Sequence, residues 1–234
     1  MREAIAWFAG LGGSSHGARL AGYRVLAAID SWEWARKCHA HNMPETRVLD
    51  FDLRKLTAFT PATVALARDL LRECGVKEPQ RWQGVHIFTP PCPAFSRAKY
   101  LGKRLGDAFD SDNRLIFSML PILAATPMSR MVVENVTGFL EETFEPVHDE
   151  LFEELQRLRG YRLHADFLRR YVLCAAEFGL CQIRRRPIFP IMLPDEPWPM
   201  PPIPTVLKWR TLWDVLGPDS GHRDVDPLCP ALTP

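Results

Sequence analysis

Cys92 lies in the segment FTPPCPAFSRAK (88–99), which follows an apolar run and holds the cysteine between prolines. A thiolate is a strong nucleophile, and nearby positive charge lowers the pKa of a thiol. Four basic residues follow between positions 97 and 104. Cys92 is therefore a candidate nucleophile, although this segment taken alone fits a buried cysteine in a proline-rich turn better.

A carboxylate follows a second apolar run, in the segment VVENVTGF (132–139). Glu134 is expected at the end of a strand, where a carboxylate that faces a pocket can exchange a proton or hold an amine. The simpler alternative is an N-cap for the next helix.

Alternating polar residues mark a third segment, CQIRRRPIF (181–189). Gln182, Arg184 and Arg186 face one side if this segment is extended, because strand side chains alternate between faces. Arginine suits contacts with phosphates or bases. A solvated basic edge strand is the simpler alternative.

A glycine-rich turn comes first along the chain, in FAGLGG (8–13). Small residues between a strand and a helix let a ligand approach the backbone and reach free N–H groups. Asp30 ends the next apolar run about 20 residues later, where a carboxylate can bind ribose hydroxyls. This pair suggests an adenosine-type ligand, against the alternative of an ordinary tight turn.

In this order and at these spacings, the four segments resemble the C5-cytosine DNA methyltransferase family. FAGLGG resembles its first motif, TPPCPAFS its catalytic Pro-Cys loop, ENV its glutamate motif and QIRRR its Q-x-R-x-R motif. The resemblance covers about residues 4–192. Inside these motifs, Thr89, Pro93 and Cys181 depart from the usual residues.

The resemblance implies methyl transfer from S-adenosylmethionine to C5 of cytosine in DNA. The Cys92 thiolate would attack C6 and make C5 nucleophilic. Glu134 would hold N4 and N3 of the base, and Arg184 would contact O2. Arg186 would be structural or reach the nucleic-acid backbone, and the base would have to leave the duplex stack.

The same resemblance assigns binding residues and no metal. The implied cofactor pocket consists of Phe8, Gly10, Gly12, Asp30, Trp32, Asp52 and Pro90. The implied nucleic-acid contacts are Ser96, Arg97, Gln182 and Arg186. RNA is an alternative substrate, because one branch of the family methylates tRNA.

Strand-like and helix-like segments alternate through residues 1–192, which predicts an α/β fold with a mostly parallel sheet. The expected strands are 4–8, 23–29, 84–88 and 130–135, and the expected helices are 31–42, 60–74, 112–126 with a bend at Pro121, and 145–160. With the resemblance, this becomes a Rossmann-like methyltransferase domain with helices on both faces of the sheet. Ligands bind such sheets beyond the carboxyl ends of the strands.

Residues 193–234 are expected to form a proline-rich arm with one short helix over 206–217. Of 21 prolines, 12 lie from Pro187 onward, and proline removes a backbone donor. The family's recognition region and late motifs are missing. Three hypotheses follow: an enzyme that needs a second polypeptide, a self-sufficient short enzyme, or an inactive remnant that binds cofactor or nucleic acid. The retained Cys92, Glu134 and Arg184 argue against the remnant.

Composition limits the classes of protein to which this sequence can belong. The 234 residues carry a formal net charge of +1, so global charge does not indicate a nucleic-acid binder. We expect no membrane segment and a cytoplasmic protein of a prokaryote or of a phage-infected host, because no long apolar run is present. Six cysteines without C-x-x-C spacing favour reduced thiols over a zinc site.

Overall fold

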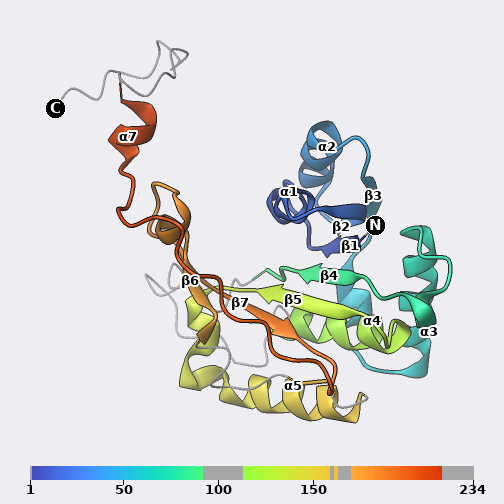
Figure 1. Cartoon of the computed structure of the whole chain (residues 1–234). Coiled ribbons are helices and arrows are strands. Elements are labelled where there is room, and N and C mark those ends of the chain that lie inside the picture. The colour runs from blue at the N-terminus through green and yellow to red at the C-terminus, as the bar shows by residue number, and fades with distance from the viewer. Residues whose placement is uncertain (1, 92–112, 159–160, 163–169, 218–234) are drawn as a thin grey trace, which may run out of the picture.

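The computed structural model describes residues 2–91, 113–158, 161–162 and 170–217, and they build one mixed sheet (Figure 1). In this described part the sheet has seven strands in the order β3-β2-β1-β4-β5-β7-β6. The strands are β1 (Arg2–Trp7), β2 (Tyr23–Asp30), β3 (Arg47–Asp50), β4 (Val85–Phe88), β5 (Arg130–Glu134), β6 (Val172–Cys174) and β7 (Arg185–Ile191). Strands β1 to β5 pair in parallel, whereas β7 runs antiparallel to β5 and β6.

Helices lie on both sides of this sheet, as the sequence predicts. α1 (Gly13–Leu20) and α2 (Glu33–Asn42) lie on one side, beside β1, β2 and β3 (Figure 1). α3 (Pro61–Glu73), α4 (Met119–Ala125) and α5 (Glu145–Arg157) lie on the other. The expected α/β architecture with a mostly parallel sheet is confirmed.

The main core fills the side that α3, α4 and α5 cover. Alternate strand residues point into it, so that Phe88 and Val133 are fully buried. Their neighbours Ile87 and Val132 face the other side and are only half-buried. Parallel strands are ordinarily covered on both faces. In the described part of the chain, the face of β4, β5 and β7 beyond α1 carries no helix (Figure 1).

The start of α3 agrees with its sequence signals. Thr60 is the N-cap and Pro61 is the first helical residue. The Thr63 backbone N–H donates to Oγ1 of Thr60 at 3.2 Å, and the Thr60 N–H donates to Oγ1 of Thr63 at 3.0 Å. This reciprocal pair satisfies two backbone donors that lack partners in a helical first turn.

The helix that was expected to bend at Pro121 changes type before the proline. The segment predicted as one helix begins as a 3₁₀-helix over Asn113–Ser118 and continues as α4. Pro121 is the third residue of α4, where a backbone N–H would have no partner within the helix, so the proline costs no hydrogen bond. The expected helix over 206–217 is also shorter, since α7 spans Leu212–Leu216.

A buried polar chain crosses the core between β1, β4 and α4. The Trp7 indole N–H donates to Nδ1 of His86 at 3.0 Å, which leaves Nε2 to donate to Oγ1 of Thr126 at 2.9 Å. The Thr126 hydroxyl in turn donates to the carbonyl of Ile122 at 2.7 Å. Complete burial lowers the pKa of His86 to about 3, so the ring stays neutral.

Stability should fall as the pH drops below the ordinary histidine pKa. His86 takes up a proton near pH 6.5 when the chain is unfolded, but only near pH 3 when it is folded. Between these values the unfolded state binds more protons, so the free energy of unfolding decreases with falling pH, by at most about 1.4 kcal/mol per pH unit for this group. Urea unfolding at pH 7.5 and 5.5 measures the change.

The variant His86→Gln is the matched control, since glutamine can occupy the network but does not titrate. Other histidines remain in both proteins. Its stability should depend less steeply on pH than that of the wild type, and equal slopes would contradict the assignment.

Candidate active site

A cavity of about 360 Å³ lies at the carboxyl ends of the central strands. It is lined by Phe8, Asp30, Ser31, Phe51, Asp52, Leu53, Arg54, Thr89, Pro91 and Leu115. Most of these residues directly follow β1, β2, β3 and β4. Parallel pairing brings the four strand ends to one edge, which is where an α/β sheet binds ligands.

Asp30 ties two neighbouring loops together at this edge. Its Oδ2 accepts the Gly10 N–H at 2.9 Å, and its Oδ1 accepts the Trp32 N–H at 2.8 Å. One carboxylate therefore fixes the glycine turn after β1 and the start of α2. Each oxygen retains a lone pair, because a carboxylate offers about four acceptor positions.

The turn after β1 has three residues with a positive φ, a backbone conformation that glycine adopts easily. Phe8 has a φ of 55° and packs edge-on against Phe88, with ring centroids 5.2 Å apart. Gly10 and Gly12 also have positive φ, and Gly12 is the N-cap of α1. A Cβ on Gly12 would lie 3.3 Å from the His39 ring, so this position favours glycine for space as well as for φ.

Asp52 lines the same cavity and is held locally. Its Oδ1 accepts the Arg54 N–H at 3.0 Å, and the Arg54 guanidinium lies 2.9 Å from its Oδ2. Hydrogen bonding from the Arg54 side chain lowers the pKa of Asp52, which keeps the carboxylate charged. A charged acceptor therefore faces the cavity beside Phe51.

Four residues of the expected cofactor set do not line this cavity: Gly10, Gly12, Trp32 and Pro90. Gly10 donates its N–H to Asp30 of the cavity and lines the second cavity described below. The Trp32 side chain is 60% exposed at the start of α2, and its backbone N–H makes the contact with Asp30. Pro90 is buried, and Pro91 lines the cavity in its place.

Glu134 is the last residue of β5 and forms an ion pair with Arg186 of β7. Nε of Arg186 lies 3.1 Å from Oε1 of Glu134, and both side chains are mostly covered. Glu134 pairs with Ile188 in the antiparallel register, which places residue 186 on the same face and just beyond the strand end. The pairing of Arg186 rather than Arg184 with the carboxylate was not foreseen from the sequence.

A second, larger cavity of about 820 Å³ continues from Glu134 across the uncovered face of the sheet. Phe8 and Thr89 line both cavities. The mostly apolar lining of this groove comes from the sheet residues Ala4, Val85, Ile87, Val132 and Ile188 and from the small residues Gly13, Ser14, Gly17, Ala18 and Ala21. Arg184 lies at the Glu134 end.

Some of the remaining expected site residues lie within the described part of the chain, and others lie outside it. Cys92, Ser96 and Arg97 lie outside the described residues, although Cys92 directly follows Pro91 of the first cavity. Gln182 is exposed in the turn before β7. Leu115 lines the cavity from the 3₁₀-helix before α4, and one leucine of the apolar run 115–117 gives no sequence signal for such a position.

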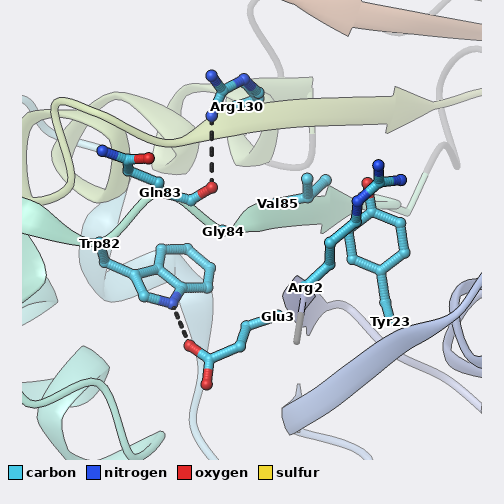
Figure 2. A pocket seen from close by; sticks show the side chains of 8 residues that line it. All are labelled: Arg2, Glu3, Tyr23, Trp82, Gln83, Gly84, Val85 and Arg130. Atoms are coloured by element: carbon cyan, nitrogen blue, oxygen red, sulfur yellow. Dashed lines mark hydrogen bonds between the residues drawn. The ribbon is translucent and has the colours of Figure 1, made fainter.

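A separate depression of about 420 Å³ opens at the other edge, where the strands begin (Figure 2). The Trp82 indole donates to Glu3 at 2.8 Å, and the ring covers Gly84, where a Cβ would lie 2.0 Å away. Arg130 donates to the Gln83 carbonyl (Figure 2). This depression is remote from Asp30 and Glu134, at the opposite ends of the strands.

The described residues contain no group of three or more histidine, cysteine or acidic residues that could hold a metal ion. None of their helices combines the length and apolar character needed to cross a bilayer.

The comparisons with known proteins identify the family and agree with this fold. Residues 3–208 match the family described as C-5 cytosine-specific DNA methylase. The type II methyltransferase M1.HphI of Haemophilus parahaemolyticus is 29% identical over 210 residues, which cover 90% of this chain and 50% of M1.HphI. M.XorII of Xanthomonas oryzae is 30% identical over 211 residues, covering 90% and 44%.

A solved structure shows the same fold. The crystal structure of a Spodoptera frugiperda DNMT2 mutant has a TM-score of 0.58 at 20% identity and covers 89% of this chain and 57% of that one. The shared fold is an α/β fold with a mostly parallel sheet and helices on both faces. The chain belongs to the C-5 cytosine-specific DNA methylase family, and it spans about half the length of the curated relatives it matches.

Proposed function

We propose that this chain transfers a methyl group from S-adenosylmethionine to C5 of cytosine in DNA, with Cys92 as the nucleophile. The observation that carries the proposal is the convergence at one sheet edge. The Glu134–Arg186 pair, the Asp30 cavity and the residue before Cys92 all lie at strand ends there. Family membership supports the same reaction class.

The first cavity suits the cofactor. Its size lies within the range of about 300–1,000 Å³ that is typical of small-molecule sites. Asp30 has acceptor positions left for ribose hydroxyls, Asp52 can accept from an exocyclic amine, and Phe8 and Leu115 offer apolar contact to a base. S-adenosylmethionine, when bound, supplies the electrophilic methyl group.

Cys92 would activate the cytosine. C5 of cytosine is a poor nucleophile, so the thiolate adds to C6, and the ring electrons shift to make C5 enamine-like. After C5 has gained the methyl group, loss of its proton expels the thiolate and restores the ring. Cys92 directly follows Pro91, which lines the cofactor cavity, and this supports the division of roles.

Glu134 and the two arginines would stabilise the activated ring. Oε1 of Glu134 contacts Arg186, so Oε2 can accept from N4 of the base while the carboxyl group shares a proton with N3. The fixed cation keeps the carboxylate oriented before the base arrives, which is the arrangement that lowers a barrier electrostatically. Arg184, at the same end of the groove, would contact O2.

The proposal has two forms: the chain is a self-sufficient short enzyme, or it needs a second polypeptide that would supply the recognition region. The apolar groove between α1 and the sheet supports the second form, because such a face is ordinarily covered in parallel sheets. RNA as the substrate and an inactive cofactor-binding remnant are the competing hypotheses.

Wild-type protein should form a covalent adduct with 5-fluorocytosine DNA in the presence of S-adenosylmethionine. Fluorine cannot leave C5 as a proton does, so the enzyme remains attached through Cys92 and migrates as a larger species in denaturing electrophoresis. Cys92→Ser should abolish the adduct and retain cofactor binding. Cys38→Ser, which alters an exposed thiol on α2, should leave the adduct unchanged.

The same assay separates the alternatives. An adduct formed by the chain alone would contradict the need for a second polypeptide, whereas an adduct that requires the separately expressed C-terminal half of M1.HphI would support it. An adduct with 5-fluorocytosine RNA but not with DNA would contradict a DNA substrate. Absence of any adduct, with cofactor binding intact, would favour the remnant.

Asp30→Asn should weaken S-adenosylmethionine binding at least tenfold in calorimetry. The amide replaces one acceptor oxygen with a donor, so the ribose and one of the two backbone N–H groups lose a partner. Asp50→Asn is the matched control, because Asp50 also ends a strand but pairs with Arg36 outside the cavity lining. Equal losses in both variants would contradict the cofactor site.

A further inference from the structure

The chain after β7 forms an arm that exposes two tryptophans. It runs alongside β7 and past β6 to α7, which stands away from the sheet (Figure 1). Trp209 is 42% exposed and Trp213 is 50% exposed. Large indoles are usually covered in soluble proteins. Two of them on one short segment therefore indicate a surface that receives a ligand.

Hydrogen bonds attach this arm beside the candidate active site. The Thr205 and Val206 N–H groups donate to the Glu177 carbonyl at 3.0 and 3.3 Å. Glu177 belongs to the 3₁₀-helix Ala175–Phe178, whose first N–H donates to the Arg184 carbonyl at 2.9 Å. The arm is thus anchored at the edge that carries Arg184 and the Glu134–Arg186 pair.

Unpaired cations accompany the tryptophans. Lys208 and Arg210 flank Trp209, and Arg184 lies just before β7, where its carbonyl accepts from the 3₁₀-helix that anchors the arm. All three are exposed, and within the described ranges none forms an ion pair with a carboxylate, although Arg210 donates to the Asp214 carbonyl at 3.5 Å. The nearby Asp214 is occupied as a cap, since its Oδ2 accepts from the Thr211 N–H and hydroxyl at 2.6 and 2.8 Å.

This combination has the chemistry of a nucleic-acid contact. Cationic side chains neutralise phosphates, and exposed aromatic rings stack on bases that have left the helical stack. An enzyme that extracts one base must unstack that base from its neighbours. The exposed Leu207 and Leu212 would also suit a polypeptide, but the unpaired cations favour a polyanion.

We propose that residues 207–213, together with Arg184, hold the nucleic-acid strand beside the extracted cytosine. Lys208 and Arg210 contact phosphates that flank the target, and Trp209 or Trp213 stacks on an adjacent unstacked base. The inference rests on the proposed function and adds the arm to its substrate-binding surface.

Fluorescence anisotropy with a labelled cytosine-containing DNA duplex tests this surface. Lys208→Ala with Arg210→Ala should weaken binding at low salt and reduce the slope of log K against log salt by about 1–2, because each phosphate contact contributes about 0.9. Trp209→Ala with Trp213→Ala should weaken binding about five- to 100-fold per stacked base, with an unchanged salt slope. Replacement by phenylalanine should restore most of the affinity.

The matched control is Lys77→Ala with Arg81→Ala, which removes the same charge from exposed positions ahead of β4. It should bind DNA as the wild type does. Unchanged DNA affinity in both arm variants would overturn this inference while the adduct assay still upheld the proposed function. A wild type that binds cofactor but no DNA would contradict the proposed function itself.

One further outcome identifies a polypeptide surface. If the arm variants bind DNA normally but no longer respond to the C-terminal half of M1.HphI, the arm docks protein, and the inference is overturned. Cofactor affinity should remain unchanged in every arm variant, which confirms that they are folded.

Discussion

The parallel pairing of β1 with β2 and β4 is the constraint on which the rest of the site depends. Ala6 pairs with Ala28 and Ile87, so the three strands end together. The loops after them must then share one edge. Asp30 fixes this arrangement by accepting N–H groups from two loops with one carboxylate, which preorganises the cavity before any ligand arrives.

Much of the sheet edge that carries the candidate site could be predicted, because interactions between residues close together in the chain determine it. Apolar runs that end in Gly10, Asp30 and Glu134 predict strands whose ends carry polar groups. Thr60 and Pro61 mark the start of α3 through hydrogen bonds made within four residues. The expected fold class needs only the alternation of these elements.

The features that sequence reasoning missed depend on long-range register. Arg184 and Arg186 both face one side of an extended segment, so spacing alone could not choose the partner of Glu134. The antiparallel pairing of Glu134 with Ile188 makes that choice. The change of helix type before Pro121 was also missed, and it places the proline in the first turn of α4, where proline is tolerated.

Within the described part of the chain, two surfaces of different character border the catalytic edge: the apolar groove and the exposed arm. The groove is apolar and lies against α1, whereas the arm is cationic and aromatic and lies beside Arg184. Apolar surface is stabilised by protein contact, and unpaired cations are stabilised by phosphate. The two surfaces thus suit a polypeptide and a nucleic acid, respectively, around one reaction centre.

Mass spectrometry of nucleosides from DNA incubated with the protein and S-adenosylmethionine tests the central claim most directly. The account predicts 5-methylcytosine with the wild type and with Glu142→Gln, an exposed carboxylate away from the site. Glu134→Gln should lower the yield at least 100-fold, because the base loses its charged partner. Equal yields from both variants, or methyl groups on another atom or base, would contradict it.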